Sequence, residues 1–316
     1  MNGQESEPLV SVFIISYNQK KFIKETLDSV LAQDYHNFEV VISDDASTDG
    51  TAEIIDEYSK KNSRLVKILN KKNLGITKNS NVCLQHCKGK YIAIMGGDDL
   101  LLPHKLSKQV SWLEEEINRV ICGHDCEIFD DITGRTISIE TPYRKDGYNL
   151  SSWIKSGMLL PAQTLMIRAS AVPQFGFDEK TSFISDWKFC IDILLSGGEC
   201  GYIPGVFSKY RRHSASITQI SLKYMTDNYK QSYLDQLYTL SYVEAFYPKF
   251  SRECAIRRKK LFYLRLMDSV KYKDFSNITS LFLSLAITPV SMLSQRMLVR
   301  KFKDLVKLIT GNKKLF

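Results

Sequence analysis

The chain has 316 residues, of which 44% are hydrophobic and 25% are charged, and its net charge is +8. These values are ordinary for a soluble globular protein, and seven cysteines in a chain of this length exclude a disulfide scaffold. The charge is uneven, because sixteen basic residues stand against four acidic ones from Lys249 onward, which gives this tail +12 and the rest −4. A strongly basic tail predicts an anionic partner, either a membrane surface or nucleic acid.

Cysteine usage and the first residues both favour a reducing, cytoplasmic setting. The acidic and polar start of the chain has neither the basic nor the apolar region of a signal peptide. Cys83 and Cys87 sit one helical turn apart, and Cys122, His124 and Cys126 alternate as on a strand. A zinc site built from these residues is one interpretation. They lack the tight two-residue spacing of zinc knuckles, and small buried side chains are the favoured interpretation.

Strands and helices are predicted to alternate along the first hundred residues. Apolar, β-branched runs predict strands at residues 9–16, 38–43, 65–69 and 91–95. Helical spacing of apolar residues predicts helices from residue 22, from residue 54 and through residues 80–87. Further along, we expect a helix over residues 103–117, a strand over 120–129 and a hairpin turn at 130–134. This alternation with short links predicts a parallel α/β sheet.

Polar clusters follow each of the first four predicted strands, where parallel α/β sheets bind ligands. The clusters are Ser16, Tyr17 and Asn18; Asp44 and Asp45; Asn73 and Gly75; and Asp98 and Asp99. Their common placement predicts a nucleotide-type site. The usual Gly-rich phosphate loops are missing, so a metal and side chains must hold the phosphates, with Lys78 and Arg212 as supplementary cations.

The fourth of these strands ends at Gly96 and Gly97, followed by the adjacent carboxylates Asp98 and Asp99. Two ionised carboxylates repel each other, and burying them is costly unless a cation neutralises them. Oxygen ligands suit Mg²⁺ or Mn²⁺, and the glycines let a ligand approach the backbone closely. A surface turn is the alternative interpretation of this stretch.

Further chemistry is predicted near residues 186 and 213. Asp186 stands at the start of a predicted helix, whose dipole favours the ionised carboxylate, and Trp187 offers a flat apolar face for a sugar ring. A helix cap is the alternative role for Asp186. His213 has an imidazole suited to metal binding, although a structural role is equally open.

These motifs, in this order and spacing, resemble the family 2 inverting glycosyltransferases, from residue 8 to 103 and more weakly to residue 217. The resemblance implies a GT-A fold, an α/β architecture with a Rossmann-like, mostly parallel central sheet flanked by helices. It implies a catalytic domain over residues 1–219, followed by a helical, basic C-terminal region over residues 220–316.

The resemblance also implies roles for residues. Asp44 would accept a hydrogen bond from the pyrimidine of a UDP-type donor, and Ser16, Tyr17 and Asn18 would flank the base and ribose. Asp98 and Asp99 look like the end of an Asp-x-Asp motif whose first aspartate is replaced by Gly96; with His213 they would hold Mg²⁺ or Mn²⁺. Asp186 would be the general base, with Ser185 in place of the usual glutamate. The remaining residues implied are Asn73, Lys78, Gly97 and Arg212 for the donor, and Gln163 and Trp187 for the acceptor.

The implied reaction moves a sugar from a UDP-hexose to a hydroxyl of a glycan or an undecaprenyl-diphosphate-linked acceptor, with a β-linked product, in bacterial O-antigen or other surface-polysaccharide synthesis. Residues 278–293 are apolar but short of the ~20 residues that span a bilayer. With the basic residues 296–314 they predict a peripheral protein at the inner face of the cytoplasmic membrane. The alternatives are a helical subdomain packed on the catalytic domain, a nucleotidyltransferase, and a nucleic-acid-binding protein, although no nucleic acid is expected as a partner.

Overall fold

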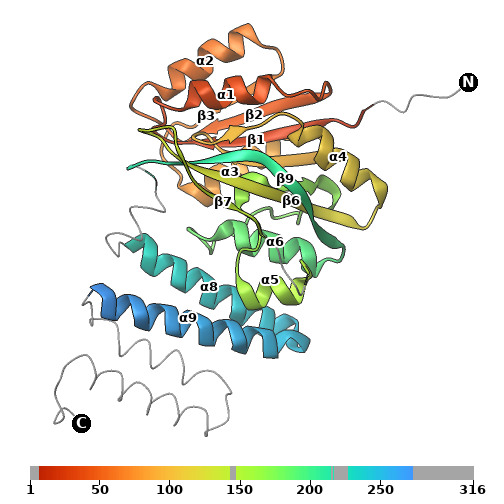
Figure 1. The fold of residues 1–316 in the computed structure, drawn as a ribbon, viewed down its shortest axis with the longest axis vertical. Coiled ribbons are helices and arrows are strands. Elements are labelled where there is room, and N and C mark those ends of the chain that lie inside the picture. Colours follow the sequence, from red (N-terminus) through yellow and green to blue (C-terminus); the bar gives the residue numbers. More distant parts are fainter. Residues whose placement is uncertain (1–6, 143–146, 215, 217–226, 273–316) are drawn as a thin grey trace, which may run out of the picture. The chain divides into compact units, whose positions relative to one another are not determined.

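The structure is a computed structural model that describes residues 7–142, 147–214, 216 and 227–272 (Figure 1). The chain divides into two compact units, residues 1–239 and 240–316. The division falls inside helix α8 (Asp227–Phe246). The domain boundary predicted between residues 219 and 220 lies outside the described residues.

Four parallel strands form the first half of the sheet, in the order β3-β2-β1-β4. They are β1 (Val10–Ser16), β2 (Phe38–Asp44), β3 (Leu65–Leu69) and β4 (Tyr91–Gly96). Each coincides with a predicted strand to within one residue at either end. Parallel registry aligns Ser16 with Asp44 and Ile15 with Gly96, so the carboxyl ends of β1, β2 and β4 lie side by side.

Helices cover both faces of this sheet (Figure 1). Val12 and Ile14 of β1 pack in one core with buried side chains from α1 (Ile23–Leu31), α2 (Thr51–Lys61) and α4 (Lys105–Glu115). On the opposite face lie α3 (Ile76–His86) and α6 (Ser185–Leu195). There Phe177 stacks on Phe189 of α6 at 3.9 Å between ring centroids and on Phe13 of β1 at 6.1 Å. Successive side chains of β1 therefore pack in two different cores, one on each face, as expected for a sheet that is buried on both sides.

The second half of the chain extends the sheet with mixed pairing. Strand β8 (Met166–Arg168) runs antiparallel to β4, and β6 (Arg119–Asp130) runs antiparallel to β8. The long strand β9 (Glu199–Arg212) pairs parallel with β6 and antiparallel with the short β5 (Leu100–Leu101). The end of β9 therefore returns to the residues that follow Asp99. The architecture confirms the predicted α/β class with a largely parallel centre.

The described part of the first unit also contains several shorter elements. They are the β6–β7 hairpin to β7 (Thr136–Glu140), α5 (Leu150–Ser156), and the 3₁₀ turns η1 (Ala162–Thr164) and η2 (Ala169–Ala171). In the hairpin turn, Asp130 Oδ1 accepts hydrogen bonds from the amide and hydroxyl of Thr133, both at 2.8 Å. This is the predicted turn.

In the described residues of the second unit, the elements are the end of α8, the 3₁₀ turn η3 (Pro248–Phe250) and α9 (Ser251–Tyr272). Arg258 of α9 donates to Glu244 of α8 at 2.8 Å and to Ser241 at 3.0 Å. Among the helices that the structure describes, none is long and apolar enough to cross a membrane. The predicted interfacial and basic segments, residues 278–293 and 296–314, lie outside the described residues.

Candidate active site

The turns after β1 and β2 are tied together around the carboxylate of Asp44. Its Oδ2 accepts hydrogen bonds from Ser16 Oγ at 2.8 Å and Ser47 Oγ at 2.6 Å, and its Oδ1 accepts one from the Ser47 amide at 2.9 Å. Asn18, with φ of 51°, donates its amide to Ser47 Oγ and accepts from the Thr48 amide, both at 2.8 Å. The structure therefore brings together Ser16, Asn18 and Asp44, as predicted from the parallel strand ends.

The neighbouring carboxylate, Asp45, is used for structure. It accepts hydrogen bonds from the amides of Leu74 at 2.8 Å and Gly75 at 2.9 Å, while Asn73 donates to the Asp45 carbonyl at 3.3 Å. Asp45 thus holds the loop of Asn73 beside the β2 end, which places this predicted donor residue at the same edge. Lys78 is different, because its exposed ammonium lies 3.9 Å from Glu179.

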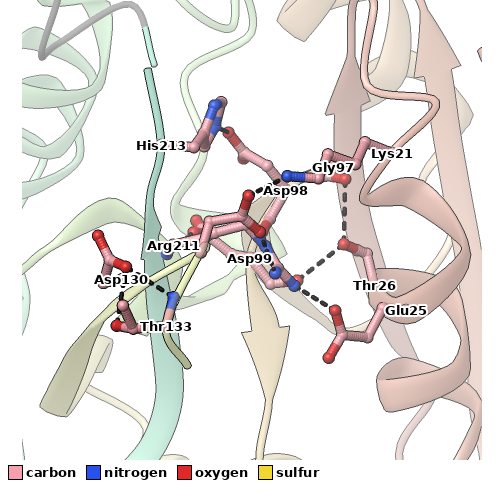
Figure 2. A network of polar contacts seen from close by, with 11 residues as sticks. Lys21, Glu25, Thr26, Gly97, Asp98, Asp99, Asp130, Thr133, Arg211 and His213 are labelled. Carbon is pink, nitrogen blue, oxygen red and sulfur yellow. Dashed lines mark hydrogen bonds and ion pairs between the residues drawn. The ribbon is translucent and has the colours of Figure 1, made fainter. Parts of the chain in front are cut away.

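Asp98 and Asp99 point in different directions (Figure 2). Asp98 Oδ2 lies 3.0 Å from His213 Nε2. The Asp99 carboxylate is buried and accepts a hydrogen bond from the Arg211 amide at 3.1 Å. Burial and the nearby Asp98 raise the pKa of Asp99 well above its usual range. The predicted metal ligands Asp98 and His213 are therefore adjacent, whereas Asp99 is directed into the protein.

Arg211 connects the elements of this region through hydrogen bonds, and nothing in the sequence distinguishes it from the neighbouring Arg212. Its Nε donates to the Asp98 carbonyl at 2.8 Å, and one terminal nitrogen donates to Glu25 at 2.5 Å (Figure 2). The other terminal nitrogen donates to Asp131 at 3.0 Å. Thr26 of α1 adds hydrogen bonds to the carbonyls of Gly97 at 3.0 Å and Asp99 at 2.9 Å. The backbone that carries Asp98 is therefore fixed by β9 on one side and by α1 on the other.

Three buried polar atoms beside these residues have no hydrogen-bond partner in the described part of the chain. They are Gln19 Oε1, Arg212 Nε and His213 Nδ1. A Cβ atom on Gly97 would lie 2.3 Å from Gln19 Oε1 and 3.1 Å from the Ser16 Cβ atom, so Gln19 and Ser16 both border the glycine. Buried polar atoms are nearly always hydrogen-bonded, so these three atoms are suited to contact a bound molecule. Gln19 carried no distinct signal in the sequence.

Asp186 stands in the first turn of α6, as predicted, and its Oδ1 accepts a hydrogen bond from the Trp187 amide at 2.7 Å. Burial raises the pKa of this carboxyl above its usual value, although that hydrogen bond opposes the shift. No hydrogen bond joins Asp186 to the Asp44 or Asp98 group within the described residues. The raised pKa brings this carboxyl closer to the range of an effective general base.

The two side chains predicted to contact the acceptor both lie in the core. Trp187 is 1% exposed and donates its indole N–H to the Trp153 carbonyl at 3.0 Å. Gln163 is 6% exposed and donates to Cys126 Sγ at 3.1 Å. Neither offers an exposed face for a sugar, because the helix turn and the 3₁₀ turn direct both side chains inward.

In the part of the chain that the structure describes, no three His, Cys, Asp or Glu side chains gather to hold a metal ion. Cys122, His124 and Cys126 are buried on β6, and burial raises the pKa of the Cys122 thiol to about 12. This placement supports the interpretation of these cysteines as small buried side chains. A metal at Asp98 and His213 would need further ligands from a bound molecule.

The profile of the family described as Glycosyl transferase family 2 matches residues 11–171, and the chain belongs to this family. The chain is 32% identical over 231 residues to the putative glycosyltransferase EpsE of Bacillus subtilis, covering 71% of this chain and 80% of that protein. It is also 38% identical over 109 residues to the putative teichuronic acid biosynthesis glycosyltransferase TuaG of Bacillus subtilis, covering 34% of this chain and 43% of that protein. These findings confirm the resemblance drawn from the motifs.

Solved structures share the fold. Residues 1–349 of S. aureus TarS in complex with UDP superpose with a TM-score of 0.65 at 18% identity, covering 87% of this chain and 78% of that chain. The mannosyltransferase PcManGT of Pyrobaculum calidifontis, in complex with GDP-Man and Mn²⁺, gives a TM-score of 0.62 at 16% identity, covering 96% of this chain and 81% of that chain. Both likenesses support the GT-A fold.

Proposed function

We propose that this protein is an inverting glycosyltransferase that uses a nucleotide-sugar donor, with UDP-hexose as the first candidate. The observation that carries the proposal is the Asp98–His213 pair with orphaned polar atoms of Gln19 and Arg212 nearby. The Asp44 group would bind the base and ribose, with Tyr17, which is 45% exposed, beside it. Structural relatives were solved with UDP or GDP-Man, which supports this class of donor.

Asp98 and His213 fit a divalent cation, because a carboxylate oxygen and an imidazole nitrogen 3.0 Å apart both suit Mn²⁺, and the carboxylate suits Mg²⁺. They would hold the ion while the diphosphate of the donor fills its remaining positions. Bound there, the ion would supply Lewis-acid stabilisation of the diphosphate leaving group. Arg212 would add a permanent positive charge, and Asn73, Lys78 and Gly97 would complete the donor side.

Asp186 would accept the proton of the acceptor hydroxyl as that oxygen attacks the anomeric carbon. Its burial favours this role, since a carboxylate with a raised pKa is a stronger base. The bond to the diphosphate oxygen breaks on the opposite face of the sugar, through a transition state with oxocarbenium character like that of glycoside hydrolysis. A single in-line displacement converts an α-linked donor into a β-linked product.

The acceptor we infer is a hydroxyl of a glycan or of an undecaprenyl-diphosphate-linked sugar in surface-polysaccharide synthesis. The name of the TuaG relative, which refers to teichuronic acid biosynthesis, supports this class of product. The basic C-terminal region would bring the protein to the anionic inner face of the cytoplasmic membrane as a peripheral protein. Liposome flotation of the full chain, with neutral vesicles as the control, tests this attachment.

The decisive experiment screens UDP-, GDP- and dTDP-sugars for hydrolysis with Mg²⁺ or Mn²⁺ and with EDTA. We expect one donor to be hydrolysed, and Asp186→Asn to lose turnover by roughly three orders of magnitude with UDP binding retained. Asp130→Asn, a change in the exposed hairpin turn, is the matched control and should behave as wild type. Release of pyrophosphate from a nucleoside triphosphate supplied with a sugar 1-phosphate would indicate a nucleotidyltransferase instead. No turnover together with a shift of labelled oligonucleotides would indicate a nucleic-acid-binding protein.

A further inference from the structure

The segment that leads into α6, residues 177–184, is held by hydrogen bonds from two helices. From α3, Asn81 exchanges hydrogen bonds with the Phe177 backbone, at 2.9 Å to its carbonyl and 2.8 Å from its amide, and Thr77 donates to the Thr181 carbonyl at 2.6 Å. From α8, Tyr238 donates to the Asp178 carboxylate at 3.0 Å. These contacts fix the start of the segment but leave its last two residues to another partner.

That partner is Asp235 of α8, which is 1% exposed. Its Oδ2 accepts hydrogen bonds from the amides of Phe183 at 2.7 Å and Ile184 at 3.0 Å, and its Oδ1 accepts one from Gln231 at 2.7 Å. Ile184 is the N-cap residue of α6 and makes no capping bond with its own side chain. A carboxyl group from α8 thus satisfies the amide of the N-cap residue, the donor that a Glu or Gln at position N3 satisfies in a capping box, and also the amide before it.

We propose that Asp235 is a positioning residue for the catalytic base. It fixes the backbone of residues 183 and 184, and Asp186 follows in the first turn of the same helix. The inference rests on the proposed role of Asp186. It extends that role because Asp235 lies beyond residue 219, where the predicted catalytic domain ends. The groups that position the base would then include one residue of the C-terminal region, Asp235.

The geometry explains why such an anchor matters to the reaction. Both amides donate to the same carboxyl oxygen of Asp235, so one side chain fixes two successive residues of the backbone. Removing the acceptor would leave two N–H groups without their partner at the point where α6 begins. A shift of about 1 Å in a reacting group can cost on the order of 100-fold in rate.

The test compares Asp235→Ala, Asp235→Asn and the matched control Tyr238→Phe in the full chain, using the sugar nucleotide hydrolysed fastest in the donor screen. For Asp235→Ala we expect kcat to fall roughly 10- to 100-fold, with KM for the donor and the Kd of UDP within about twofold of wild type. Asp235→Asn keeps an acceptor oxygen and should recover most of the rate. Tyr238→Phe removes a bond from α8 to the same segment and should retain kcat.

Backbone hydrogen exchange supplies a readout that does not depend on turnover. The peptide over residues 183–187 should exchange faster in Asp235→Ala and not in Tyr238→Phe. If Asp235→Ala does not fold, Gln231→Ala replaces it, since it removes only the bond to Asp235 Oδ1, and we expect about a threefold fall in kcat with faster exchange.

Unchanged kcat in Asp235→Ala, or an equal fall in Tyr238→Phe, would overturn the positioning role. If the wild-type protein hydrolyses no sugar nucleotide, the proposed function is contradicted and not the positioning role of Asp235. In that case the exchange measurement still decides whether Asp235 anchors the entry to α6.

Discussion

The same substitution at two adjacent arginines at the end of β9 should affect two different properties of the protein. Arg211 is 5% exposed and donates to the Asp98 carbonyl, to Asp131 and to Glu25. Arg212 has a buried Nε without a partner among the described residues. We expect Arg211→Met to lower stability and Arg212→Met to lower affinity for the donor.

The stability loss can be worked from the partners. Breaking a buried ion pair costs about 3–5 kcal/mol, and Asp131 is only 6% exposed. The low end applies because Lys21 also contacts Asp131. Glu25 is 61% exposed, so its pair adds only about 0–1 kcal/mol. A loss of about 3 kcal/mol lowers Tm by roughly 6–12 °C in a unit of this size.

Thermal unfolding and UDP titration with Mn²⁺ measure the two effects on the same samples. Arg212→Met should keep its stability within about 0.5 kcal/mol of wild type, since no described carboxylate forms an ion pair with Arg212. Its Kd for UDP should rise about tenfold or more, because a charge-assisted contact to phosphate is worth at least ~1.4 kcal/mol. The reasoning fails if Arg211→Met unfolds within 1–2 °C of wild type, or if the two variants lose equal stability.

Other outcomes follow from the same geometry. Burial raises the pKa of Asp186 above 3.8, so the carboxylate form that acts as base is lost as pH falls through that raised value. The acid limb of the profile of kcat against pH should therefore lie at a higher pH than expected for an ordinary aspartate. An acid limb near pH 4 would contradict this. Gly97→Ala should weaken UDP binding, because its methyl group would lie 2.3 Å from Gln19 Oε1, and adding Gln19→Ala should restore part of the UDP affinity. Equal UDP affinity in the wild type, the single variant and the double variant would contradict close packing of Gly97 at the donor site. Trp187→Phe should cost roughly 2–3 kcal/mol in thermal unfolding, since it loses core volume and a hydrogen bond, and an unchanged Tm would place the indole elsewhere. EDTA should abolish donor hydrolysis and added Mn²⁺ should restore it; hydrolysis that persists in EDTA would remove the metal from the mechanism.

Local patterns predicted the first half of the fold well, and long-range pairing is where they failed. Strand β3 has the predicted bounds, because a short apolar run between turn residues leaves few alternatives. Strand β9 was not predicted: Gly201, Pro204 and Gly205 interrupt it, and it has no apolar run. It exists because β6 and β5 supply partners from distant parts of the chain.

For the site, residue types and strand ends were predictable, but side-chain directions were not. Asp98 and Asp99 are equivalent in the sequence, and only the return of β9 decides that Asp99 is directed inward. Trp187 follows the candidate base as expected, yet packing of α6 buries its ring. Adjacent residues project to different sides of a strand or helix, and tertiary contacts select which side meets the ligand.

The pairing of β5 with β9 has a consequence for the order in which the molecule assembles. Leu100 meets Lys209 across the sheet, so the two halves of the site are joined by a contact between residues more than a hundred positions apart. Closing so long a loop is slow compared with forming the local strand–helix units. During synthesis, the first four strands emerge well before residue 211, and the carboxylates after β4 must wait without their arginine. The nascent protein thus gains its scaffold early and its chemistry late.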